Sequence, residues 1–423
     1  MHKKYEIRCP VYGFVSLNNW EREIINHKYF QRLRRIRQLA WTDYVYPGAM
    51  HTRFEHSLGV MHMASLLYDG IVQRSSELLH EEMGYNEDGL GRNRVLIRLA
   101  ALLHDVGHAP FSHVSEELLP SQDGGEETYK HESYSAQIVR MYFTNIIENH
   151  PLNKNYDFKA NDVAGLLEGS QDAGSALFWR DLISGQMDAD RMDYLLRDSL
   201  HAGVDYGRYD WQRLVHTIEA VPGPENESPR LGVSEGGWHA AEGLIVARYF
   251  MFTQVYFHKT RVAYDYHLKN ALLEMLPDGK FPPPTKEEDL EKYMKWDDWC
   301  VLGELIKGNG GEHGKVLRQR NHYRLAWETP ETPKEIDFEK LSSRREALEN
   351  FRVIEAEADK SWYKIGETDI PVVSESKEQK VAPLSKYSSF VDKIEPIRQM
   401  RLYVHPKDLN DAKKQLEKIR REK

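Results

Sequence analysis

Histidine and aspartate cluster between Leu102 and His113, next to a run of apolar residues. The apolar residues from Val95 to Leu103 cover most of a helix circumference, a pattern typical of a buried helix. A buried carboxylate such as Asp105 is costly without a cation or several donors, and the adjacent His104 offers a second ligand atom. His108 follows four residues later, on the same face of a continued helix, and Pro110 would end that helix. The spacing indicates a metal site.

An isolated His-Asp pair can be a chance occurrence, because a core histidine usually bonds a backbone carbonyl. First-row metals held by imidazole and carboxylate take about four protein ligands, so two more are needed. His56 lies in a segment with helical apolar spacing, and Asp190 begins a stripe in which Tyr194 and Asp198 follow at intervals of four. The predicted metal ligands are therefore His56, His104, Asp105 and Asp190.

The order of these four ligands resembles the H…HD…D signature of the HD-domain metal-dependent phosphohydrolases. Several further motifs are similar to the deoxynucleoside triphosphate (dNTP) triphosphohydrolase branch of that family: Tyr29–Arg34, Arg37–Leu39, Tyr46–Ala49, Arg53–Gly59 and His108–His113. The resemblance covers residues 5–265 well and the C-terminal part more loosely.

The resemblance implies a mainly α fold, with an HD-domain helical core and a small α+β C-terminal lobe. It implies metal-dependent hydrolysis of dNTPs to a deoxynucleoside and inorganic triphosphate, with attack on the α-phosphorus. One divalent ion is expected per site, and the ligand types suit Mn, Fe, Zn, Ni or Mg, while additional Mg²⁺ could accompany the nucleotide. A bound ion would lower the pKa of its water from 15.7 toward roughly 7 to 9 and polarise a phosphoryl oxygen.

The same resemblance assigns catalytic roles to residues near the HD motif. His113 is the candidate acid that protonates the departing 5′ oxygen, since a histidine pKa lies close to working pH. His108 and His131 would contact phosphate or share the proton, and Glu132 could orient one of these rings. Without the resemblance, His131 would be taken for a surface-loop histidine.

Substrate contacts are also implied by the resemblance. For the triphosphate they are Arg53 and Arg191, with Lys259 and Arg261 as further candidates, and for the sugar they are Gln38, Leu39, Tyr194 and Asp198. A planar guanidinium can bind phosphate oxygens bidentately. Tyr194 and Asp198 would bind the 3′ hydroxyl and crowd the 2′ position, which favours deoxyribose. For Lys259 and Arg261 an ordinary exposed helix face is an equal alternative.

Three functional classes stay open on the sequence. The first is a dNTP triphosphohydrolase, the second an HD phosphatase or phosphodiesterase acting on another nucleotide or phosphoester, and the third a nucleotide-binding regulatory protein. The complete ligand set weighs against the third, and the released product distinguishes the first two. A nucleotide activator stays open, but Asn26 stands where activated relatives use an acidic residue for guanine, so a guanine activator is doubtful.

Composition narrows the partners. The chain has 423 residues, a net charge of −9 and 40% hydrophobic residues, so it can bury a large core and favours small nucleotides over nucleic acid. Only two cysteines are present, which suits a reducing compartment. We find no signal peptide, lipidation motif or membrane-spanning run, so we expect a cytoplasmic protein without a membrane partner. The resemblance adds a homo-oligomer, a dimer or a tetramer.

The elements that must position these residues are mostly helical. Pro277–Thr285 suggests a boundary between a catalytic core of residues 1–280 and a C-terminal helical and α+β lobe of residues 281–423. The predicted elements are extended structure over Tyr5–Val15, helices from about Glu21 to Leu276 with a hairpin of Leu214–Ala220 and Arg230–Val233, a helix over Glu288–Ile306, strands at Tyr323–Trp327, Trp362–Ile365 and Ile370–Val373, and a terminal helix over Asp408–Lys423.

Overall fold

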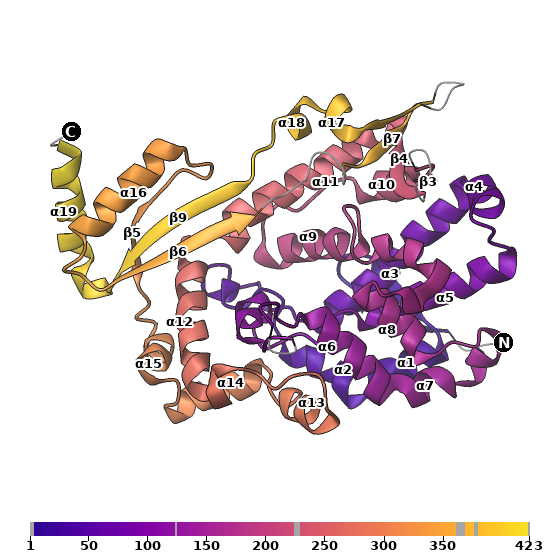
Figure 1. Ribbon diagram of the computed structural model, residues 1–423, viewed down its shortest axis with the longest axis horizontal. Coiled ribbons are helices and arrows are strands. Elements are labelled where there is room, and N and C mark those ends of the chain that lie inside the picture. Colours follow the sequence, from indigo (N-terminus) through magenta and orange to yellow (C-terminus); the bar gives the residue numbers. More distant parts are fainter. Residues whose placement is uncertain (1–3, 123–124, 224–228, 361–368, 376–379, 422–423) are drawn as a thin grey trace.

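The computed structural model describes residues 4–122, 125–223, 229–360, 369–375 and 380–421 (Figure 1). Helices dominate these residues, which confirms the mainly α fold. The helices are α1 (Asn19–Asn26), α2 (Lys28–Gln31), α3 (Arg53–Arg74), α4 (Ser76–Glu81), α5 (Glu87–Leu103), α6 (His131–Ile138), α7 (Thr144–Glu148), α8 (Ala160–Glu168), α9 (Ala189–Ala202), α10 (Trp211–Thr217), α11 (Trp238–Met251), α12 (Lys259–Met275), α13 (Glu287–Tyr293), α14 (Asp298–Lys307), α15 (Gly311–Gln319), α16 (Glu335–Ala347), α17 (Leu384–Tyr387), α18 (Ser389–Asp392) and α19 (Leu409–Arg421).

The strands of the described residues form three small sheets. They are β1 (Tyr5–Cys9), β2 (Gly13–Leu17), β3 (Ile218–Val221), β4 (Arg230–Ser234), β5 (Arg324–Glu328), β6 (Val353–Lys360), β7 (Pro371–Val373), β8 (Val381–Pro383) and β9 (Ile397–Val404). The sheet orders are β1-β2, β3-β4-β7-β8 and β5-β9-β6. The extended N-terminal segment and the later hairpin are confirmed, although Leu214 belongs to α10. The predicted strand Trp362–Ile365 lies outside the described residues.

The centre of the molecule is α3, which packs between α5 and α9. It is buried on most of its circumference because it runs through the core, and it continues for 22 residues. Gly59 makes the contact with α9 possible, since an added Cβ would lie 1.9 Å from Asp193 Oδ1 and 2.3 Å from Arg197 Nη2. A close helix–helix contact therefore brings polar side chains of α9 against the body of α3.

The helix that precedes the HD motif is shorter than predicted. α5 ends at Leu103 and His104 occupies its C-cap, so His104 and His108 do not share a helix face. The chain turns here because Gly107 passes so close to α6 that an added Cβ would lie 2.3 Å from the Ser135 nitrogen. The HD motif is thus a tight turn at a helix end.

The main core continues across residue 280, where the sequence suggested a boundary. Leu290 of α13, Val301 of α14 and Val372 of β7 are buried in the same apolar cluster as the side chains of α3. The single helix predicted over Glu288–Ile306 is two helices, α13 and α14, because Asp297 interrupts it and caps α14 by accepting the Cys300 N–H at 2.9 Å.

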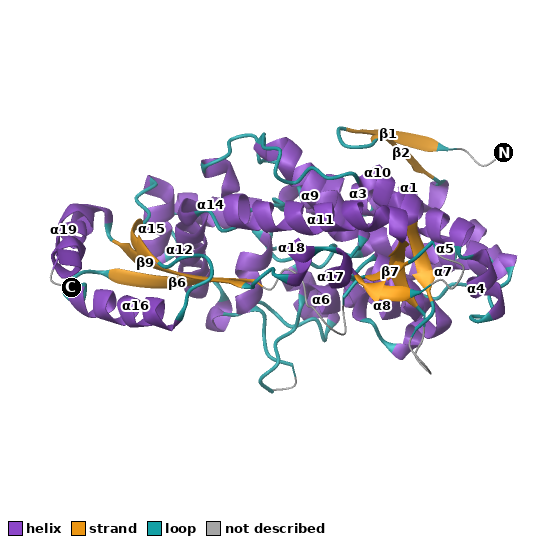
Figure 2. Ribbon diagram, turned by 90° about the horizontal axis from the view of Figure 1, so that it is seen from above, coloured by secondary structure: helices purple, strands orange, loops and turns teal. Residues whose placement is uncertain are grey.

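The small C-terminal lobe is confirmed as α+β. Sheet β5-β9-β6 packs against α16 and α19 around a core of its own, which includes Leu341, Leu402 and Leu416. In Figures 1 and 2 this lobe lies at one end of the molecule, and α12 lies between it and the helices around α3. No helix of the described residues is long and apolar enough to cross a membrane.

Candidate metal centre and active site

Three elements meet at the predicted metal ligands. His56 comes from α3, His104 and Asp105 from the end of α5, and Asp190 from the first turn of α9. His56 Nε2 lies 2.9 Å from Asp190 Oδ1 and 3.6 Å from Asp105 Oδ2. His104 Nε2 lies 3.3 Å from Asp105 Oδ1 and 3.7 Å from Asp190 Oδ1. Two imidazoles and two carboxylates therefore point at one small volume.

The chemistry of these donors fits a divalent cation. His104 Nδ1 lies 2.8 Å from the Ala101 carbonyl and donates to it, so Nε2 is the ring nitrogen that faces the other candidate ligands. That Nε2 is buried and has no hydrogen-bond partner among the described residues. His56 turns its Nδ1 to Asp193 Oδ2 at 2.8 Å, the carboxylate partner that orients metal-bound histidines. Asp193 is in turn held by two bonds of 2.8 Å from Arg197.

Hydrogen bonds and opposite charges among the candidate ligands and their neighbours shift the pKa values of these side chains. Burial lowers the pKa of His56, but hydrogen bonds with Asp190 and Asp193 outweigh it and raise that pKa to about 10. Burial raises the pKa of Asp105, yet the charges of Arg53 and His104 outweigh it and lower that pKa to about 2. A divalent ion would replace the proton on His56, so binding the ion releases a proton.

Arg53 joins the metal ligands to the loop that follows them. It is 3% exposed, its Nη1 contacts Asp105, and its Nε donates to Ser112 Oγ at 2.8 Å. The guanidinium also lines the cavity described below, so it is a buried cation beside the ligands.

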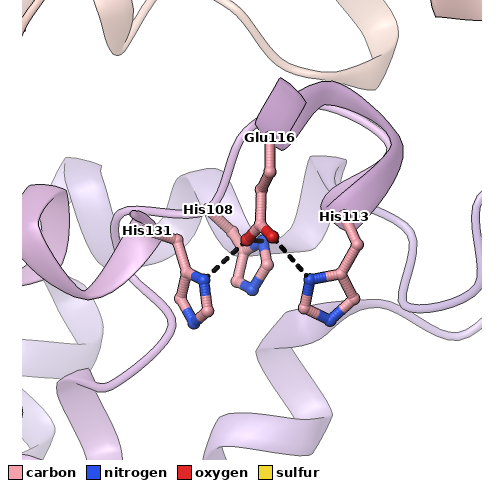
Figure 3. Close-up of side chains that lie close together, drawn as sticks. All are labelled: His108, His113, Glu116 and His131. Atoms are coloured by element: carbon pink, nitrogen blue, oxygen red, sulfur yellow. Dashed lines mark hydrogen bonds and ion pairs between the residues drawn. The ribbon is translucent and has the colours of Figure 1, made fainter. Parts of the chain in front are cut away.

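Three histidines gather around Glu116 next to this centre (Figure 3). His131 Nδ1 lies 2.6 Å from Glu116 Oε1, and His113 Nδ1 lies 2.9 Å from Oε2. The ring of His108 stacks on that of His131 with 4.0 Å between centroids. Glu116 and His113 come from the 3₁₀ turn Ser112–Leu118, and His131 is the first residue of α6.

The charges of this cluster are unequal. Burial lowers the pKa of His131, but Glu116 outweighs it and raises that pKa to about 9, so the ring is protonated at neutral pH. Burial and the charge of Arg53 hold the pKa of His108 well below its ordinary value, so that ring stays neutral. Burial raises the pKa of Glu116, but the charges of His113 and His131 outweigh burial and lower that pKa below its ordinary value, so the carboxylate stays ionised. The cluster can therefore donate a proton from His131.

Glu116 is the residue that sequence reasoning missed. The orienting role was given to Glu132, which lies 3.3 Å from His131 Nδ1, farther away than Glu116. The spacing His113-x-x-Glu116 was the available signal, because residues three apart in a helical turn face the same side.

One cavity of about 860 Å³ unites the predicted residues. It is lined by three of the four metal ligands, the catalytic candidates and most of the substrate contacts: Gln38, Leu39, Arg53, His104, Asp105, His108, His113, His131, Glu132, Asp190, Arg191, Tyr194, Asp198 and Arg261. His56 is fully buried behind Asp190. Lys259 lies elsewhere, in a separate cavity of about 390 Å³ with His322, Arg324 and Lys413.

Two of the residues predicted to bind the sugar differ in whether they have a free hydrogen-bond acceptor. Gln38 Oε1 is buried and has no hydrogen-bond partner in the described part of the chain, so a ligand donor could reach it. Asp198 is 1% exposed and uses both oxygens, accepting from Tyr256 Oη at 2.6 Å and contacting His51 Nε2 at 2.7 Å. Asp198 therefore lines the cavity with both carboxylate oxygens already bonded to neighbouring side chains.

The helical core, the His-Asp ligand set at helix ends and the adjoining histidine cluster define a metal-dependent phosphohydrolase of the HD class. Residues 53–198 match the HD domain, and residues 209–412 match the HD associated region. The chain belongs to the HD-domain phosphohydrolase family.

Relatives of known sequence and structure agree with this assignment. The chain is 33% identical to the uncharacterized protein MJ1154 of Methanocaldococcus jannaschii, over 71% of this chain and 54% of that protein. It is 29% identical to the protein named deoxynucleoside triphosphate triphosphohydrolase SAMHD1 homolog of Dictyostelium discoideum, over 75% of this chain and 59% of that protein. It thus spans little more than half the length of these two relatives.

A solved structure matches nearly the whole chain. The crystal structure of a hypothetical protein from Aquifex aeolicus has a TM-score of 0.79 and 29% sequence identity, and the match covers 98% of this chain and 100% of that one. The helical core and the C-terminal lobe are therefore a shared architecture.

Proposed function

We propose that the protein hydrolyses deoxynucleoside triphosphates to a deoxynucleoside and inorganic triphosphate. The observation that carries the proposal is that one cavity is lined by three of the four candidate metal ligands, by several arginines that include Arg53 and Arg191, and by a protonated histidine held by a carboxylate. A relative named as a deoxynucleoside triphosphate triphosphohydrolase homologue supports the choice of substrate.

The metal would be held by His56, His104, Asp105 and Asp190, with Asp193 orienting the His56 ring. A divalent ion held there would supply Lewis acidity, activating a water for attack at neutral pH and polarising a phosphoryl oxygen. Arg53 and Arg191 neutralise the triphosphate. Arg191 is itself anchored to Asp188 Oδ2 at 2.5 Å, which fixes its guanidinium at the cavity wall.

The leaving 5′ oxygen needs a proton, and the cluster around Glu116 is suited to give it. His131 holds a proton at neutral pH, and Glu116 bonds both His131 and His113, so either ring can deliver the proton while the carboxylate stabilises the cation. Neutral His108 stacks against His131 and restricts its ring.

Gln38 offers a free acceptor to a sugar hydroxyl, and Leu39 and Tyr194 give the sugar an apolar wall. The proposal includes a homo-oligomer, which the sequence resemblance implies, and it leaves a nucleotide activator open to the test below.

Product analysis tests this function directly. The purified protein is incubated with Mn²⁺ or Mg²⁺ and each of the four dNTPs, with and without a second dNTP or GTP, and the products are separated by ion-exchange chromatography. Deoxynucleoside plus triphosphate is the expected result. Monophosphate or pyrophosphate would instead identify a phosphatase or phosphodiesterase of the same family, and no turnover with metal bound would favour a regulatory role.

A further inference from the structure

The junction between α13 and α14, at Trp296–Asp298, holds two segments that line the catalytic cavity. The Trp296 carbonyl accepts from Arg32 Nη2 at 2.6 Å, and Asp297 Oδ2 pairs with Arg35 Nε at 2.5 Å. These bonds attach the associated region to the segment that leads into Gln38 and Leu39.

Asp298 reaches both segments at once. Its Oδ2 accepts the backbone N–H of Arg37 at 2.8 Å, and its Oδ1 accepts the backbone N–H of Phe111 at 2.7 Å. The residue is 1% exposed, so these bonds are shielded from water. A single buried carboxylate therefore ties the sugar-side segment to the loop that follows the HD motif.

The loop at Phe111 has a backbone that needs such support. Phe111 and Ser112 are both left-handed, with φ of 54° and 60°, a conformation that L side chains rarely adopt. Phe111 stacks on Trp41 with 4.8 Å between ring centroids. The Asp298 bond and this stacking together hold two consecutive strained residues.

The strained turn places Ser112 between Arg53 and Arg37. Ser112 Oγ accepts from Arg53 Nε at 2.8 Å and donates to the Arg37 carbonyl at 2.9 Å. Asp298 and Ser112 are thus two bridges between the same two segments, and the second of them orients the guanidinium that contacts Asp105.

We propose that Asp298 is a positioning residue through which the HD associated region sets the orientation of Arg53 in the catalytic cavity. Asp298 is not among the residues that line the cavity. Its carboxylate therefore acts on the cavity through the Phe111–Ser112 turn and not by touching the substrate. This inference rests on the proposed function for its kinetic readout, but its structural readout is independent of turnover.

The test compares full-length, metal-loaded Asp298→Asn and Asp298→Ala with the wild type. Glu304→Gln is the matched control, because it removes a carboxylate on the same helix whose side-chain hydrogen bonds among the described residues are to Lys307 and Asn309. Hydrogen–deuterium exchange is followed in peptides covering residues 32–39 and 105–119, together with kcat, KM and metal content. Asn keeps one acceptor but faces the other N–H with a donor, so it loses one bridge at constant size.

We expect both Asp298 variants to speed exchange in both peptides and to lower kcat about tenfold or more, with KM within about threefold and metal content unchanged. Glu304→Gln should match the wild type. Ser112→Ala, which removes the other bridge, should lower kcat in the same way if Asp298→Ala does not fold.

Unchanged exchange in either peptide, or faster exchange with unchanged kcat, would overturn the inference. If the wild type does not hydrolyse dNTPs, the proposed function fails by itself. The inference is then judged by exchange and by the affinity for inorganic tripolyphosphate, a probe for Arg53, which must fall in Asp298→Asn and stay unchanged in Glu304→Gln.

Discussion

His104 is the candidate ligand whose ring nitrogen Nε2 makes no hydrogen bond with the described residues. That nitrogen is buried, and a buried polar atom left without a partner costs roughly 1–3 kcal/mol. A bound cation removes that cost. This buried nitrogen is the observation that supports the proposal of His104 as a metal ligand.

Replacing His104 by Ala should abolish metal binding and turnover. A ligand lost from a four-ligand site lowers metal affinity by more than the roughly 10–100-fold typical of orienting partners. Metal content is measured by elemental analysis of the purified protein, and activity by triphosphate release. His216→Ala, at an exposed position on α10, is the control, and a fully active His104→Ala would contradict the ligand assignment.

Glu116 should control the pH dependence of turnover. Glu116 raises the pKa of His131 to about 9, so a reaction that needs protonated His131 keeps its rate as pH rises and loses it only near pH 9. In Glu116→Gln the charge is gone while burial still lowers the pKa of His131, so the alkaline limb should move to lower pH, although Glu132 and Asp105 still favour the protonated ring. The kcat/KM profile measures this shift.

The exposed Glu126, replaced by Gln, is the control for that experiment and should leave the limb in place. An unmoved limb in Glu116→Gln would mean that another group supplies the proton.

At the scale of elements, the contact between α3 and α9 fixes the metal centre. His56 and Asp190 belong to these two helices, and Asp193 and Arg197 fill the space beside Gly59. The separation of the helices therefore determines how far apart the ligands stand.

Gly59→Ala should destabilise the fold and weaken metal binding together. The new methyl group would collide with Asp193 and Arg197, and overpacking of this kind costs about 1–3 kcal/mol. Gly91→Ala on α5 is the control, since apart from its chain neighbours and the backbone of its own helix no described atom lies within 4 Å of the Cβ that it would add, and helix propensity should make it neutral or stabilising. Thermal unfolding and metal titration would contradict the expectation if both variants behave alike.

Much of the site could be predicted from the sequence, because the residue types of metal ligands and their spacing along helices can be recognised without knowing how the loops fold. The α9 stripe from Asp190 follows simple helical periodicity, and the structure has that helix. The HD turn could not be predicted, since α5 ends where Gly107 meets Ser135, a contact between segments 28 residues apart. Asp298 was missed because its partners Arg37 and Phe111 are distant in sequence, whereas Glu116 was missed because Glu132, beside His131, was assigned the orienting role.

Lys259 and Arg261, at the start of α12, show where the prediction of substrate contacts from the sequence stops. Both are cationic and two residues apart on α12, yet Arg261 lines the catalytic cavity and Lys259 lines the other one. Residues two apart on an α-helix point in nearly opposite directions, so the two side chains lie on different faces of α12, and the sequence alone did not indicate which face meets the catalytic cavity.

At the scale of the whole molecule, a bound metal should add to the stability of the entire core. A ligand that binds only the folded state stabilises it by about 2.7 kcal/mol at 100 times its dissociation constant. Adding Mn²⁺ should therefore raise the melting temperature and a chelator should lower it. His104→Ala is the control and should respond to neither, whereas an equal response in both proteins would place the ion elsewhere.

The continuous core predicts joint unfolding of the two family regions. Side chains of α3, α13, α14 and β7 share one apolar cluster, whereas α16, β9 and α19 have a smaller one. Native-state hydrogen exchange should give α14 the same opening free energy as α3 and a lower one for α19. An α14 that opens independently of α3 would contradict a common core.

The position of Asp298 in the chain also has a consequence for synthesis. The four metal ligands are complete once residue 190 is made, but the carboxylate that braces the Phe111 turn follows about a hundred residues later. At elongation rates of about 5–20 residues per second, this gap lasts on the order of 5–20 s. During that interval a nascent chain holds the ligands of the centre without the brace, so metal capture can precede the formation of a working cavity on the ribosome.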